Sequence, residues 1–230
     1  MNTNELITRY RAGERDFSGV DLGGANLSHT RFDGINLNHA NLGGANLSCT
    51  KLNNADLNHT NLEYTNLHKA ELINADLSDT TIMTTGMDET NFTGANLSRM
   101  DASRVSMTNC NFSRANLSNV FFYETKLDGS NLSEANLSHA TFNNVYLTGA
   151  NLSNANLTGA NLITVLGLSK ANLSGIKLTA ALYSSCTEFP AEFDLTRAVC
   201  VSRKGADLSD YDLSNRRLGR VPRTVLRIFP

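Results

Sequence analysis

Apolar residues recur at every fifth position through most of this 230-residue chain, and neither a helix nor a strand accommodates that period. From Phe17 to Leu162, thirty successive positions at this spacing hold twenty Leu, six Phe, two Met, one Ile and one Ala. In an α-helix each fifth residue lies about 500° further round the axis, so these side chains would share no face. In a β-strand they would alternate between the two faces. The chain must therefore turn a corner in every five-residue unit.

The residues around each apolar centre repeat as well. The residue two positions before the centre is small in almost every unit, most often Ala or Thr, and the residue just before the centre is Asn fifteen times and Asp five times. A typical unit is A-N-L-S-x, as in residues 25–29. If four units close a square, the centre and the small residue point inward on every side. A large side chain beside a small one fills a narrow core without overpacking it.

A four-unit coil predicts that residues twenty apart stack directly. The central Leu residues from Leu37 to Leu157 at this spacing should form one buried column. One unit reverses the usual sizes. Its centre is Ala102, and the usually small position two residues earlier is Met100, so the large and the small residue exchange places. Stacked Asn side chains should exchange amide hydrogen bonds. Two such columns are Asn96, Asn116, Asn136 and Asn156, and Asn91, Asn111, Asn131 and Asn151.

The pattern A(D/N)LXX between residues 17 and 162 resembles that of the pentapeptide repeat family. The resemblance implies an all-β solenoid, namely a right-handed quadrilateral β-helix with four five-residue faces per coil. We expect about eight to nine coils over residues 17–183, in a rod about 41 Å long at about 4.8 Å per coil. An N-terminal cap helix within residues 1–16 and an irregular C-terminal cap with a basic tail in residues 184–230 complete the predicted domains.

The two ends of the repeat depart from the period. Residues 2–12 predict a short capping helix with Asn2 or Thr3 as N-cap and Gly13 as its stop. After Leu162 the centres shift by one residue, which indicates an insertion near 165–167 that Gly167 can accommodate. Pro190 suits the first turn of a helix, so residues 190–198 predict a second short cap helix. The shifted period then returns at Leu208, Leu213 and Leu218.

Composition excludes several classes of protein. The N-terminus holds no apolar stretch typical of a secretory signal, and no run approaches the roughly 18 apolar residues that span a bilayer. We therefore expect a cytoplasmic protein with free thiols, although Cys186 and Cys200 flank a short segment and could pair if oxidised. The net charge of −2 points to no nucleic-acid partner. The oligomeric state stays open.

Catalytic, cofactor and metal sites are not predicted. A filled prism with flat walls offers no pocket with convergent polar groups, so we expect a protein that is not an enzyme and has no cofactor. His39 and His59 should stack on one outward column, followed by Asp79 and Arg99. Two imidazoles and a carboxylate could hold a divalent metal, but an exposed wall supplies neither a fourth ligand nor supporting hydrogen bonds. A solvated column is the favoured interpretation.

One wall carries an unusual set of outward residues. Most outward positions are small and polar, but on the side centred on residues 62, 82, 102, 122 and 142 several are large or aromatic. Aromatic, Met and Arg side chains are typical of protein-binding hot spots, whereas isolated apolar surface residues are ordinary. The candidate protein-binding patch is Tyr64, Met83, Arg104, Phe121 and Tyr123.

These observations lead to three functional hypotheses. The first is a non-enzymatic scaffold that mediates protein–protein interaction, with a regulatory role conceivable and the partner unidentified. The second is a DNA mimic that interacts with gyrase, as the resemblance implies for part of the family. Residues 203–230 carry seven Lys or Arg and three Asp, so the remainder has a net charge of −6. Spread over about 41 Å, this is about four-fold less than the charge density of DNA. The third is a purely structural spacer.

Overall fold

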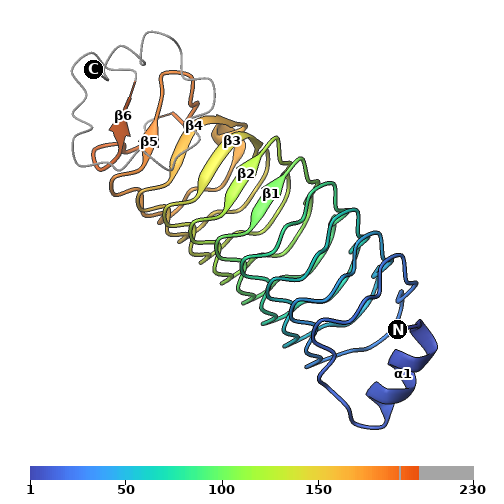
Figure 1. The fold of residues 1–230 in the computed structure, drawn as a ribbon. Helices are drawn as coiled ribbons and strands as arrows, with labels where there is room; N and C mark the ends of the chain where they lie inside the picture. The colour runs from blue at the N-terminus through green and yellow to red at the C-terminus, as the bar shows by residue number, and fades with distance from the viewer. Residues whose placement is uncertain (192, 202–230) are drawn as a thin grey trace, which may run out of the picture.

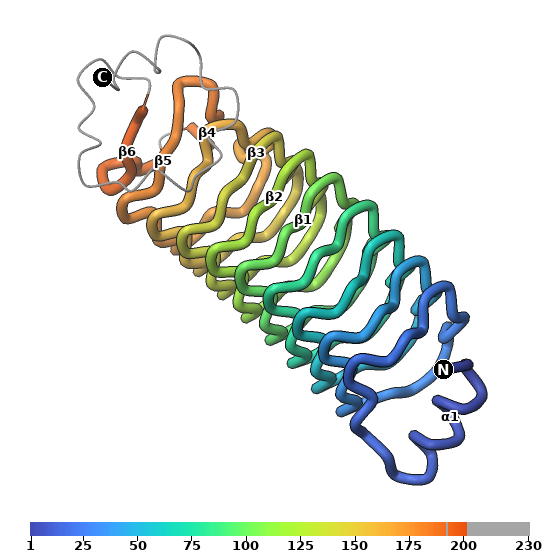
Figure 2. The backbone as a smooth tube through the Cα atoms, in the orientation of Figure 1, coloured from blue at the N-terminus to red at the C-terminus, as the bar shows by residue number. Residues whose placement is uncertain are grey.

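The chain folds into a parallel β-solenoid, which the computed structural model describes for residues 1–191 and 193–201. Figures 1 and 2 show coils stacked into a rod with a helix at one end. Parallel bridges join residues twenty apart from Asp16 and Asn36 through to Asn136 and Asn156. The twenty-residue register confirms the predicted solenoid of four five-residue walls per coil.

Regular elements occupy only part of the chain. The six strands form one parallel sheet in the order β1-β2-β3-β4-β5-β6, on the wall centred on Ala102 and Phe122 (Figure 1). The stacked strands thus extend over about five turns, whereas eight to nine coils were predicted. In the other coils each wall pairs with its neighbour through a single β-bridge, because the chain turns before a longer strand can form. The elements are α1 (Thr3–Arg11), β1 (Asp101–Ser103), β2 (Phe121–Tyr123), β3 (Thr141–Tyr146), β4 (Asn161–Leu166), a 3-10 turn η1 (Leu168–Lys170), β5 (Leu182–Tyr183) and β6 (Val199–Cys200).

A tight turn follows each apolar centre. The N–H of Ala25 donates to the carbonyl of Leu22 at 3.0 Å, and the residue between them at the corner, Gly24, has a φ of 68°. The equivalent corners at His39 and Arg114 adopt the same left-handed backbone with φ of 57° and 59°. An L-residue in this region costs about 1–2 kcal/mol. The turn and the ladder bonds on either side must offset that cost at each corner.

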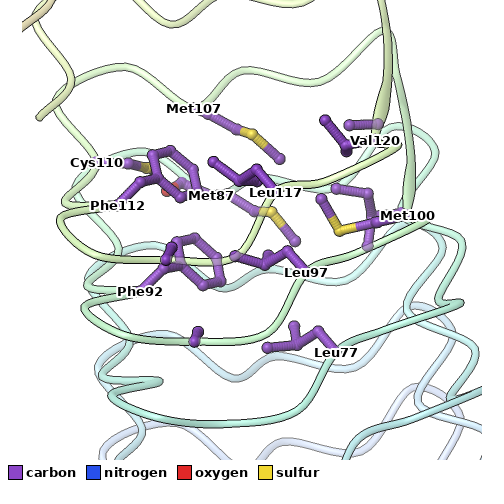
Figure 3. Close-up of a cluster of buried hydrophobic side chains, with 14 of the residues drawn as sticks. Leu77, Met87, Phe92, Leu97, Met100, Met107, Cys110, Phe112, Leu117 and Val120 are labelled. Carbon is purple, nitrogen blue, oxygen red and sulfur yellow. The ribbon is translucent and has the colours of Figure 1, made fainter. Parts of the chain in front are cut away.

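The core is a stack of inward side chains. Leu37, Leu77, Leu117 and Leu157 have exposed fractions of 1% or less, which confirms the buried leucine column. Figure 3 shows Leu77, Leu97 and Leu117 one above another. Phe92 and Phe112 stack with ring centroids 5.0 Å apart, and Met100 and Ala102 are both fully buried. The large and small residues therefore do exchange places within the core.

Threonine at the small inward position forms a hydrogen bond that alanine cannot. Thr60 Oγ1 donates to the carbonyl of Leu37, one coil earlier, at 2.8 Å, and Thr90 Oγ1 donates to that of Leu67 at 2.7 Å. The same bond is made by Thr50, Thr65, Thr85, Thr125 and Ser130, and by the thiol of Cys110. Each hydroxyl is therefore satisfied inside the core and ties two coils together.

The outward asparagines form the predicted ladders. Asn116 Nδ2 donates to Asn96 Oδ1 at 3.0 Å, and Asn136 Nδ2 donates to Asn116 Oδ1 at 3.1 Å. The column begins at Asp76, whose carboxylate accepts from Asn96 at 3.0 Å. Each Asn oxygen also accepts the N–H two residues on, as Asn116 does from Ser118. A ladder member must both donate and accept, so Asn fills its interior and Asp its head.

The N-terminal helix caps the first coil as predicted. Asn2 is the N-cap, with its side chain accepting from the N–H of Glu5 at 2.9 Å. Leu6 is fully buried against the coil. Tyr10 packs edge-on against Phe32 at 5.2 Å and donates its hydroxyl to the Asp33 carbonyl at 2.8 Å. The helix thus covers apolar surface and occupies one carbonyl that has no coil above it.

At the C-terminal end the structure confirms one prediction and contradicts another. The register changes from twenty to twenty-one residues beyond η1, as in the pair Asn156 and Lys177, and Gly167 before η1 has a φ of 76°, so the insertion is confirmed. The described part of 190–198 forms turns rather than the predicted helix. Phe193 stacks on Phe189 at 5.4 Å, so aromatic packing holds the segment. The predicted centres at 208, 213 and 218 and the basic stretch 203–230 lie outside the described residues.

Candidate interaction surface

Strand β2 presents two aromatic rings on the outside of the solenoid. Phe122 is fully buried, so the alternation of the strand directs its neighbours Phe121 and Tyr123 outward. Their rings lie parallel with centroids 6.4 Å apart and an interplanar angle of 3°. Both side chains are half-buried. We call this parallel pair of outward rings the aromatic platform.

A cation borders this platform. The guanidinium of Arg104, at the corner of the preceding coil, lies 5.8 Å from the centroid of the Tyr123 ring. Its Nε also lies 3.1 Å from Glu124 Oε2, and this ion pair raises the pKa of Arg104 above its usual range. The cation is therefore held beside the ring and remains exposed to solvent.

The other two predicted patch residues lie further along the same wall. Tyr64 and Met83 belong to adjacent coils, joined by a bond from Tyr64 N to the Met83 carbonyl at 3.2 Å, and their exposed fractions are 66% and 39%. Ser103, the cross-strand partner of Tyr123, separates Met83 from the platform. The five residues therefore form two groups on one wall, with Arg104 in the coil between Met83 and Tyr123.

Sequence reasoning missed two exposed apolar residues beside this wall. Tyr146 on β3 and Leu166 on β4 are cross-strand partners with exposed fractions of 42% and 46%. Tyr146 occupies the slot before a centre that usually holds Asn or Asp, and this is the signal that identified Phe121. Leu166 lies in the irregular stretch, where the repeat predicts no direction for its side chain.

The histidine column is a stack of rings and lacks the geometry of a metal centre. His39 and His59 lie parallel with centroids 4.9 Å apart. Asp79 is engaged by Arg99 through a bond of 2.8 Å from Nε to Oδ1, which lowers the pKa of Asp79. A shallow hollow of about 260 Å³ lies beside His59 and Asp79. Within residues 1–191 and 193–201, no group of three or more His, Cys, Asp or Glu side chains is arranged to hold a metal ion.

Several carboxylates elsewhere on the walls are paired or hydrogen-bonded. Burial tends to raise the pKa of Asp88, but hydrogen bonds from Ser106 and Thr108 outweigh this and lower it; the two hydroxyls lie 2.6 and 2.7 Å from its Oδ1. Ion pairs also join consecutive coils. They are Lys51–Glu71 at 2.8 Å, Lys69–Glu89 at 3.4 Å, Arg99–Asp79 at 2.5 Å and Arg104–Glu124 at 3.1 Å.

The four cysteines are free thiols. Cys186 is exposed and Cys200 half-buried, and they form no disulfide with each other. Cys110 lies in the core, where burial raises the pKa of its thiol to about 12. Among the described residues, no helix has the length and apolar content needed to cross a membrane.

Two family models match the sequence. The model described as Pentapeptide repeats (8 copies) matches residues 16–53 and 40–79, and the model described as Pentapeptide repeat region matches residues 102–166. Together these matches cover more than half of the chain. No curated protein sequence matches it significantly.

Similar solved structures include HetL and QnrB1. HetL, a pentapeptide repeat protein involved in heterocyst differentiation regulation in the cyanobacterium Nostoc sp. strain PCC 7120, is 26% identical over 82% of this chain and 99% of HetL, with a TM-score of 0.28. Trypsin-treated QnrB1, a plasmid-mediated fluoroquinolone resistance protein, is 20% identical over 71% of this chain and 82% of QnrB1, with a TM-score of 0.39. The five-residue period, the twenty-residue register and both family matches agree that the chain belongs to the pentapeptide repeat family.

Proposed function

We propose that this protein is a non-enzymatic scaffold that binds a protein partner through the wall carrying the aromatic platform. The observation that carries the proposal is the stacked pair Phe121 and Tyr123, which stands where the repeat usually places Asn and Ser. Two rings that are already half-buried against the wall lose little side-chain entropy on binding, and Tyr and Arg are enriched among the residues that contribute most to interface energetics. Arg104 offers a partner both a cation and a stacking surface.

Several features of the other walls support a binding role over catalysis. The Asn and Asp side chains of the repeat are taken up in turns and ladders, as Asn116 and Asp76 show. Asp88 is held by three hydrogen bonds to one oxygen. These hydrogen bonds give the side chains a structural task in the turns and ladders, which supports a scaffold role for the walls. The cytoplasmic location that we propose is supported by the four free thiols.

Charge on the walls argues against the DNA-mimic alternative. Glu71, Asp79 and Glu124 each pair with a cation one coil away, so adjacent charges cancel. A mimic needs a dense row of unpaired negative charges that reproduces the phosphate spacing of DNA. We therefore expect neither inhibition of gyrase supercoiling nor protection from a quinolone in a plasmid assay. Either effect would favour mimicry over the scaffold.

The scaffold proposal is tested by restoring the repeat consensus on the platform. The protein is used as bait in extracts of its native host, and the captured protein is then titrated against the wild type and the double variant Phe121→Asn/Tyr123→Ser. We expect the variant to keep the wild-type thermal stability and to bind at least tenfold more weakly, equivalent to about 1.4 kcal/mol. The matched control is Ser133→Ala/Glu134→Ser, which changes outward slots on another wall.

The outcomes separate the hypotheses. Equal binding by the wild type and the platform variant, at equal thermal stability, would refute the assignment of this wall. Equal loss in the platform variant and the Ser133/Glu134 control would show that binding follows overall stability. A bait that captures no partner would favour the structural spacer.

A further inference from the structure

A cleft lies where the capping helix meets the first coil. Its volume is about 430 Å³, within the range of sites for small molecules. Helix α1 forms one side of the cleft and residues 29–32 form the other. The helix lies at the N-terminal end of the rod (Figure 1). The lining includes Ile7, Tyr10, Arg11, His29, Arg31 and Phe32.

The way α1 is anchored leaves this space open. The helix is fixed on one side by the terminal amine of Met1, which donates to the Asp21 carbonyl at 3.1 Å. It is fixed on the other by Tyr10, whose hydroxyl bonds the Asp33 carbonyl. Tyr10 and Phe32 hold each other edge-on at 5.2 Å. The apolar floor of the cleft is therefore preformed rather than dependent on a ligand.

The cleft is cationic. Among the described residues, neither Arg11 nor His29 pairs with a carboxylate, and both are exposed at its edge. Arg31 also lines the cleft, although its guanidinium is paired with Asp33. Arg11 therefore leaves an unpaired cation, and His29 an unpaired imidazole, at a concave site with an aromatic floor.

The first coil also offers a backbone donor without a partner. In the next coil, the N–H of Lys51 donates to the carbonyl of Thr30 at 2.9 Å. Arg31 occupies the equivalent position one coil earlier, so its N–H points toward the cap instead of toward another coil. No described residue accepts from this N–H. It is available to a ligand oxygen in the cleft that Arg31 lines.

The C-terminal end of α1 does not offset this cationic character. A helix C-terminus carries partial negative charge on its free carbonyls. Here the Thr8 carbonyl accepts from Ala12, and the Tyr10 carbonyl accepts from both the N–H of Gly13 and the side chain of Arg15 at 2.8 Å. These donors already satisfy the carbonyls of Thr8 and Tyr10 at the C-terminal end of the helix.

We propose that this cleft binds a small organic anion with a flat apolar body, of the aryl carboxylate class. The ring packs against Ile7, Tyr10 and Phe32. The carboxylate faces Arg11 and His29 and accepts from the N–H of Arg31. The size of the cleft fits a molecule of one or two rings, and the site is separate from the aromatic platform on β2. The proposal does not depend on the protein partner proposed above.

The test compares 2-naphthoate with its neutral amide on the intact protein. Amide resonances of the ¹⁵N-labelled chain are followed during titration at low ionic strength. We expect saturable shifts centred on residues 7–11 and 29–32, and a Kd at least tenfold lower for the acid than for the amide. Arg11→Gln, which replaces one exposed helix former with another, should raise the Kd for naphthoate at least fivefold. The control Arg114→Gln removes an exposed corner cation on a distant coil and should leave the Kd unchanged.

Three results would overturn the proposal. The first is equal affinity for the acid and the amide. The second is a loss of affinity in Arg114→Gln as large as that in Arg11→Gln, which would indicate general attraction of anions to the surface. The third is shifts centred on β2, which would place the probe on the aromatic platform.

Discussion

Replacing Leu117 by Ala tests the inward assignment of the apolar centres at the middle of the stack. Leu117 is fully buried, with Leu97 in the coil before it and Leu137 in the coil after it. The substitution removes three carbon atoms, a transfer loss of about 2.4 kcal/mol at about 0.8 per carbon. The ladder bonds at Leu97 N (2.8 Å) and Leu117 N (2.7 Å) hold the coils apart, so we expect about 40 Å³ of cavity to remain and to cost about a further 1 kcal/mol.

The expected loss of about 3.4 kcal/mol is measured by guanidinium unfolding followed by circular dichroism. For a chain of this size it corresponds to a fall in Tm of about 7–14 °C. Leu117→Asn should not fold, because it buries an amide among carbon atoms that offer no partner. Ser118→Ala is the matched control: its side chain points outward, and only the backbone of Ser118 takes part in the ladder.

A common guanidinium midpoint for all three variants would refute the assignment of the apolar centres to the core. Equal unfolding of Leu117→Ala and Ser118→Ala would mean that the centre is not the core position. A loss of only about 2.4 kcal/mol in Leu117→Ala, with the control unchanged, would mean that neighbouring coils collapse into the cavity and leave only the transfer loss. The assumption of a rigid ladder would then be wrong.

Three further variants test the bonds between coils. Thr60→Val removes the hydroxyl that bonds the Leu37 carbonyl; because that carbonyl keeps its turn bond from Ala40, we expect a loss of only about 0.5–1.5 kcal/mol, and a loss above about 3 kcal/mol in chemical unfolding would contradict this. Asn116→Asp places a carboxylate oxygen where an amide donated to Asn96 in the preceding coil, so Tm should fall at pH 7 and recover as acid protonates the new carboxyl; a Tm unaffected by pH would show that the ladder contributes nothing. Asp88 has a lowered pKa in the folded state, so its contribution is complete above about pH 4 and is lost as pH falls further; Tm of Asp88→Asn should therefore fall less than that of the wild type between pH 7 and pH 3, and parallel falls would rule Asp88 out as a source of acid sensitivity.

The aromatic wall shows how far a candidate site could be predicted. The position before each apolar centre is usually Asn or Asp, so an aromatic residue there identified Phe121. The structure places Phe121 outward beside Tyr123. Their stacking and half-burial depend on the side-chain positions of a strand, which periodicity does not contain. Leu166 follows a local irregularity in the pairing of β3 with β4 and directly precedes the inserted stretch. The repeat pattern ends there and does not predict which way the Leu166 side chain points.

The left-handed corners were also beyond prediction. Their occupants include Tyr64, Lys69 and Glu89 with φ between 59° and 61°, and none of these residue types favours such a backbone. The conformation arises because the hydrogen bonds to the coils above and below, together with the hydrogen bond of the turn itself, fix the path of the backbone at each corner. Local preference is overridden by contacts between residues twenty positions apart.

By itself the sequence determined the period, the inward and outward sides, the asparagine ladders and the helix that caps the first coil. These follow from rules in which one residue type performs one task at a regular spacing, because each coil meets nearly the same neighbours. Only the tertiary structure decided the sheet on one wall, the pairing of Arg104 with Glu124, the turns in place of the second cap helix and the cleft beneath α1. Each of these depends on where the repeat stops or varies, and there the outcome depends on which side chains from different coils meet in space.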